Sequence, residues 1–117
     1  MINLSTLRDR MSRKFSTGGT RFDSAFLDAV NDVSTDLRRE CFLDVADIET
    51  TTDQLDLEAK YTPAYRDGVA YYIQSSGEFQ KEPDDKLGMR YRNALAQCQF
   101  LAIDELDPTA GTPLGSW

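Results

Sequence analysis

Apolar positions recur every three or four residues in two stretches of the N-terminal part of the chain, a pattern typical of amphipathic helices. The first stretch covers residues 4–15, and either Asn3 or Ser5 can serve as its N-terminal cap. The second begins near Asp23, whose carboxylate can cap a helix, and continues to Cys41. Two consecutive glycines separate the stretches, so we expect two helices joined by a short break.

The apolar period shortens between residues 44 and 58. Apolar side chains there fall roughly on alternate positions among threonines and aspartates, as is typical of β-strands. A turn near Thr52 and Asp53 would join two such strands as a short β-hairpin. Because an isolated hairpin is only marginally stable, we expect it to pack on the helices or to pair with a neighbouring copy.

Helical spacing returns in the second half of the chain. A third helix is predicted to begin at Thr62, as its cap, and to stop at Gly77. Gly68 inside it costs roughly 1 kcal/mol relative to alanine, which indicates a close approach of another helix. A fourth helix is predicted to begin at residues 83–85 and to end near residues 104–106.

The last segment, residues 107–117, differs in composition from everything before it. Its two prolines and two glycines disfavour a helix, and its apolar bulk is too small to form a core. Trp117 is the only tryptophan, a residue type that often dominates binding energy. The segment is therefore either a docking tail or a frayed terminus without a role. The predicted fold class is mainly α, with about four helices in a domain of residues 1–106, a hairpin between helices two and three, and an extended tail.

Charge is distributed unevenly along the chain, whose formal net charge is −7. Residues 1–21 are basic, although the chain as a whole is acidic. A basic helix could touch nucleic acid, but the acidic remainder argues against phosphate binding. Asp28, Asp32 and Asp36 recur every four residues, which predicts an acidic stripe on the second helix. That stripe is either a solvated face or a surface that meets the basic helix of a neighbouring copy.

The sequence displays no candidate for catalysis. It contains no histidine, and Cys41 and Cys98 stand alone in apolar stretches, which predicts buried free thiols. Its only glycine pair lacks the lysine of a phosphate-binding loop. We therefore expect no enzyme activity, no metal and no cofactor. No apolar run approaches a membrane span, and the N-terminus lacks the apolar stretch of a signal peptide, so we expect no membrane partner. The free thiols indicate synthesis in a reducing cytoplasm.

The order of elements combines with three sequence runs: L-D-L-E-A-K-Y at 55–61, Y-R-D-G-V-A-Y-Y at 65–72 and Y-R-N-A-L at 91–95. This combination resembles the head-to-tail adaptor proteins (connector or head-completion proteins) of tailed bacteriophages. The resemblance covers roughly residues 20–103. It is one of order and residue type, without a diagnostic motif.

The resemblance implies a virion protein of the phage neck, which forms a ring, usually dodecameric, between the portal protein and the tail or next neck protein. Packaged DNA would pass through the ring without sequence-specific binding. The tail would dock on the portal, with Pro113, Leu114 and Trp117 as its contact residues. The expected contacts between copies are Arg8, Arg10, Arg13, Lys14, Asp28, Asp32 and Asp36. The alternative is a small helical interaction module of another kind, either another virion protein or a regulator with a basic N-terminal arm.

Overall fold

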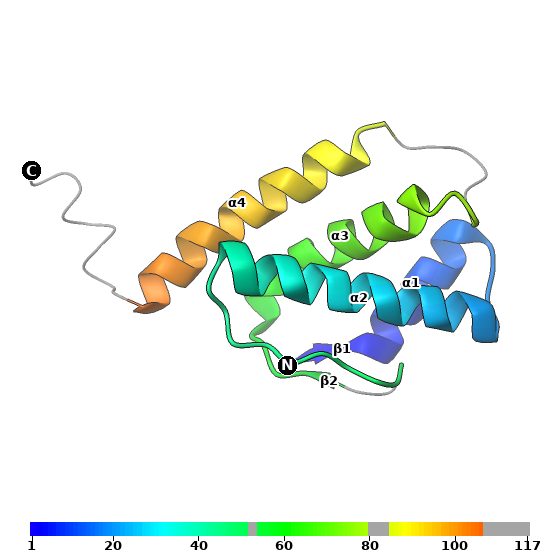
Figure 1. Ribbon diagram of the computed structural model, residues 1–117, viewed down its shortest axis with the longest axis horizontal. Helices are drawn as coiled ribbons and strands as arrows, with labels where there is room; N and C mark the ends of the chain where they lie inside the picture. The colour runs from blue at the N-terminus through cyan, green and yellow to red at the C-terminus, as the bar shows by residue number, and fades with distance from the viewer. Residues whose placement is uncertain (52–53, 80–84, 107–117) are drawn as a thin grey trace, which may run out of the picture.

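The computed structural model describes residues 1–51, 54–79 and 85–106, with side chains up to residue 103. Helices dominate this part of the chain, as predicted (Figure 1). The elements in chain order are β1 (Ile2–Asn3), α1 (Leu4–Phe15), α2 (Thr20–Glu40), β2 (Gln54–Leu55), the 3₁₀ turn η1 (Ala59–Tyr61), α3 (Thr62–Ser75) and α4 (Leu87–Leu106). The predicted mainly α class with four helices is confirmed.

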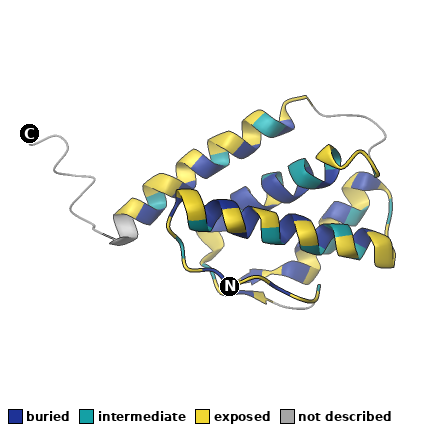
Figure 2. Cartoon of the chain, viewed as in Figure 1, coloured by how far each residue is buried: buried dark blue, intermediate teal, exposed yellow. Residues whose placement is uncertain are grey.

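The core lies where the helices face one another. α3 packs against both α2 and α4, and α1 packs against α2 near the other end of the bundle (Figure 1). Buried and exposed positions alternate with the helical period along each helix (Figure 2), because only one stripe of each helix meets its neighbours. The largest fully buried side chains are Tyr61, Tyr65, Phe22 and Phe26.

The predicted helix starts are correct to within a few residues. Asn3 is the cap of α1, since its Oδ1 accepts a hydrogen bond from the Thr6 amide at 3.2 Å. α2 begins at Thr20 and not near Asp23, because Gly19 at φ 94° supplies the turn into the helix. Asp23 lies in the first turn, where a carboxylate interacts favourably with the helix dipole.

The structure corrects the predicted hairpin between residues 44 and 58. A short two-stranded antiparallel sheet is present, but β2 pairs with β1 at the start of the chain, with Ile2 opposite Leu55 and Asn3 opposite Gln54. The predicted first strand, around Val45 and Ile48, is irregular. The predicted turn at residues 52–53 lies outside the described residues.

Side chains of α2 explain why the segment after α2 forms no strand. Asn31 brackets Ile48: its Nδ2 donates to the Ile48 carbonyl at 3.1 Å, and its Oδ1 accepts from the Ile48 amide at 2.9 Å. Arg38 donates to the Val45 carbonyl at 2.7 Å and to Asp47 at 3.0 Å. These bonds hold the segment along α2 and satisfy backbone groups that a partner strand would otherwise bond.

The predicted close approach at Gly68 is confirmed. A Cβ placed on Gly68 would lie 2.5 Å from Cε1 of Tyr91 and 2.6 Å from Cγ2 of Val33. Only glycine therefore lets α3 contact α2 and α4 at this level. α3 begins at Thr62, with Tyr61 rather than Thr62 in the cap position, and α4 ends within the predicted range.

Candidate functional site

The basic residues of α1 do not all face the same part of the protein. Arg8 turns toward α2, where its Nε lies 2.6 Å from Oδ1 of Asp23 and its guanidinium lies 5.8 Å from the centre of the Phe22 ring. The hydrogen bond with Asp23 raises the pKa of Arg8 above its ordinary value. Arg8 thus helps to join α1 to α2 within one chain.

Arg10 and Lys14 face a cavity of about 380 Å³ between α1, α3 and α4, which we name the basic cleft. Its lining residues are Arg10, Met11, Lys14, Arg66, Asp67, Ala70, Leu87 and Arg90. Four of them are cationic and one is acidic, so the cleft carries a net positive charge. Nε of Arg66 lies 3.8 Å from Oδ1 of Asp67, so this carboxylate is paired with an arginine of its own helix. It therefore does not compensate the positive charges of Arg10 and Lys14 on α1.

Two residues of the basic cleft were missed by sequence reasoning. Arg66 and Arg90 stand on separate helices, far along the chain from Arg10 and Lys14, and their positions in the sequence do not connect them to the first helix. They lie near Arg10 and Lys14 because α1, α3 and α4 line the same cavity. Arg13 instead lines a second cavity of about 390 Å³ near the N-terminus, which also touches Arg10.

The acidic stripe predicted on α2 is only partly exposed. Asp28 and Asp32, which we name the acidic pair, are exposed. Desolvation raises the pKa of Asp32, and the negative charges of Asp28, Asp36 and Asp47 raise it further. Within the described part of the chain, neither member of the acidic pair has an ion pair with a cation.

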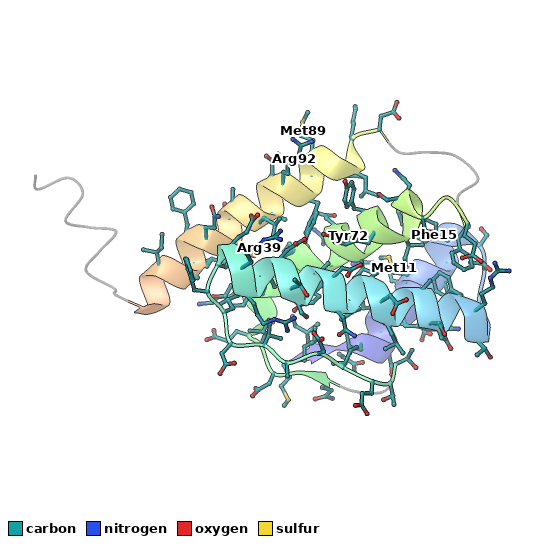
Figure 3. The ribbon with its side chains drawn as sticks, viewed as in Figure 1. Met11, Phe15, Arg39, Tyr72, Met89 and Arg92 are labelled. Carbon is teal, nitrogen blue, oxygen red and sulfur yellow. The ribbon has the colours of Figure 1, made fainter. Side chains whose placement is uncertain are left out.

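The third member of the predicted stripe lies inside the protein. Asp36 is only 8% exposed, so its placement on an exposed stripe was wrong. Its Oδ2 accepts hydrogen bonds from the hydroxyls of Tyr72 at 2.5 Å and Tyr91 at 2.6 Å, and its Oδ1 lies 3.1 Å from Arg39. Figure 3 shows Tyr72 between α2 and α3, with Arg39 on α2. Burial, and then the bond to Asp36, raise the pKa of both tyrosines. We name these four residues the Asp36 cluster; it joins α2, α3 and α4.

The basic cleft and the acidic pair are separate surfaces of the molecule. Tyr65, Gly68 and Tyr72 are among the positions of α3 that face α2. Arg66 and Ala70, which line the cleft, lie roughly opposite to them around α3, because residues three or four apart share a face. The cleft is lined from α1, α3 and α4, whereas the acidic pair lies on α2, which contributes no lining residue.

The remaining expectations concern the two cysteines, metal binding, membrane spans and the tail. Cys41 and Cys98 are buried free thiols, as predicted, and burial raises the pKa of each to about 11. Among the described residues, no group of three or more potential ligands could hold a metal ion. No helix in the same part of the chain is long and apolar enough to cross a membrane. The tail residues Pro113, Leu114 and Trp117 lie outside the described residues.

Comparison of the chain with protein-family models, curated protein sequences and solved structures gave no significant match.

Proposed function

We propose that this protein is a structural component of a tailed-phage neck, where copies form a ring that joins the portal to the tail machinery and continues the DNA channel. The role is one of assembly in the virion and involves no reaction. The partners are the portal, the next neck or tail protein and further copies of the chain.

The observation that carries this proposal is the presence of opposite charges on two separate surfaces of one small body. A closed ring built head to tail needs two unlike surfaces per subunit that complement each other. The basic cleft and the acidic pair have that relation. Their charges would also fix the register of neighbouring subunits.

The net charge of −7 suits a channel through which DNA passes. Binding to duplex DNA grows with the number of phosphates that a protein neutralises, and an acidic body neutralises few. Packaged DNA could then slide past the ring without being held. In this proposal the tail supplies the contact with the portal, and many tails on one ring would act together through avidity.

Co-purification of the full chain with the portal protein of the same phage tests the proposal. We expect a stable complex with the full chain and none with a chain that ends at Leu106. Trp117→Ala should weaken the complex, and Met89→Ala serves as a control, because Met89 is exposed on the outer side of α4 (Figure 3). Absence of any complex with the full chain would contradict the neck function. Salt-sensitive binding of the full chain to duplex DNA would favour the regulator instead.

A further inference from the structure

We propose that the basic cleft of one copy receives the acidic pair of the next copy, so that α2 of one subunit lies alongside α1 of its neighbour. This inference rests on the proposed ring and names its subunit interface. It adds Arg66 and Arg90 to the predicted contacts, and it removes Arg8, Arg13 and Asp36 from them.

The spacing of the charges matches on the two surfaces. Arg10 and Lys14 are four residues apart on α1, and Asp28 and Asp32 are four residues apart on α2. Side chains at that spacing are neighbours on a helix surface, about 5–6 Å apart at Cβ. Two helices laid side by side can therefore form two ion pairs at once.

Both sets of charges are available to a neighbour. Arg10, Lys14 and the acidic pair are all exposed. Within the part of the chain that the structure describes, none of the four has an ion pair of opposite charge. By contrast, Asp23 and Asp36, also on α2, already have cationic neighbours within the chain.

Unrelieved repulsion around the acidic pair also favours a cationic partner. Desolvation, and then the charges of Asp28, Asp36 and Asp47, make the ionised form of Asp32 less favourable. A guanidinium or ammonium group brought beside it would reverse that effect. The basic cleft offers such groups from three helices, including Arg66 on α3 and Arg90 on α4.

A second copy fits the cleft better than DNA does. A duplex bound at the cleft would bring many phosphates close to a body with a net charge of −7, and Asp67 would lie among them. A neighbouring subunit presents only two carboxylates at the required spacing. Repeating the same contact around a ring satisfies both surfaces of every subunit.

Reversal of charge on each surface tests the inference. One variant carries Arg10→Glu and Lys14→Glu, and the other carries Asp28→Lys and Asp32→Lys. The measurement is self-association by analytical ultracentrifugation at low salt, up to millimolar protein. We expect the wild-type chain to associate, and each variant alone to associate at least tenfold more weakly.

An equimolar mixture of the two variants gives the decisive result. In the mixture each reversed surface can meet a complementary one, so we expect association to recover to within about threefold of wild type. The chain that carries all four substitutions should recover as well. Loss without recovery, or a wild-type chain that stays monomeric at millimolar concentration, would overturn the inference. The charge-matched control is Arg13→Glu with Arg92→Glu, since neither residue lines the basic cleft; it should leave association unchanged.

The same variants separate this interface from the function on which it rests. A chain that binds the portal but shows no recovery in the mixture would refute the interface and leave the neck function standing. Recovery without any portal complex would refute the neck function and retain the interface. Duplex binding by the wild type that the Arg10→Glu, Lys14→Glu variant loses would identify the cleft as a nucleic-acid site and overturn the inference.

Discussion

Asp32 and Asp36 lie one helical turn apart on α2, yet their surroundings are opposite. Asp36 is buried and accepts hydrogen bonds from two tyrosines, with Arg39 beside it. Asp32 is exposed, and the charges around it that shift its pKa are all negative. Asp36 thus holds three helices together, whereas Asp32 adds unfavourable charge to the free chain.

The difference shows that residue type and spacing do not fix the role of a charged side chain. The roles diverge because α3 and α4 bring Tyr72 and Tyr91 to one carboxylate and not to the other. A carboxylate that the fold leaves without a cation is a better candidate for intermolecular contact than one that the fold already uses. The comparison therefore separates stability from assembly along a single helix.

The largest expected effect comes from removing the two carboxylates one at a time. Asp36→Ala removes the carboxylate that accepts from the buried Tyr91 hydroxyl and the partly buried Tyr72 hydroxyl, and it should lower the free energy of unfolding by about 3 kcal/mol. Asp32→Ala should change it by no more than about 0.5 kcal/mol, as is usual for exposed positions. Urea denaturation of both variants at neutral pH gives the two values. Similar losses in both variants would contradict the division of roles.

The helix interface beside the Asp36 cluster provides the next test. Gly68→Ala forces a methyl group into contact with Tyr91 and Val33, and should cost about 2 kcal/mol through overpacking. Gly88→Ala is the matched change on α4, where the added Cβ would lie 3.3 Å from the ring of Tyr71, which is partly exposed. There the gain in helix propensity offsets the contact, and we expect a change within about 0.5 kcal/mol. If thermal unfolding shows that Gly68→Ala and Gly88→Ala destabilise the protein equally, the close approach of Tyr91 and Val33 to Gly68 does not make that position less tolerant of a methyl group.

Local pattern predicted much of this fold, because helices depend on residues close in sequence. The four helices follow from apolar spacing, Asn3 was one of the two caps predicted for the first helix, and Gly68 indicated close packing. The strand pairing did not follow, because β2 takes its partner from the start of the chain. Alternation around Val45 indicated a strand, but Arg38 of α2 satisfies its carbonyl.

The sequence predicted only the α1 side of the basic cleft. Arg10 and Lys14 belong to a basic helix that is evident in the sequence. Arg66 and Arg90 belong to the site because helices distant in sequence pack together, which no local spacing reveals. The burial of Asp36 has the same origin, since both of its tyrosine partners lie more than thirty residues away.

A smaller effect is expected at the end of α2. Phe42 adopts a positive φ of 56° although it is 78% exposed, so it bears backbone strain with little burial in return. Phe42→Gly should therefore stabilise the free chain by about 1 kcal/mol in urea denaturation. Phe42→Ala keeps the Cβ that causes the strain, and its effect should be close to zero. A loss of stability in the glycine variant would mean that the ring contributes to packing.

The smallest expected effect is a pH dependence that comes from Asp32 itself. Its pKa in the folded chain lies above the ordinary value of about 3.9, so the folded state holds this proton more tightly than the unfolded state does. The resulting stabilisation is present at low pH and is lost as pH rises from that ordinary value through the folded-state pKa. Asp32→Asn cannot lose a proton there, so its stability relative to wild type should increase over that interval and stay constant above it. Urea denaturation of dilute protein at several pH values measures this difference, and a constant difference across the interval would show that folding does not raise the pKa of Asp32. If the basic cleft of a second copy holds Asp32, the same comparison at high protein concentration should reverse, because the cation would then stabilise the ionised carboxylate that the asparagine lacks.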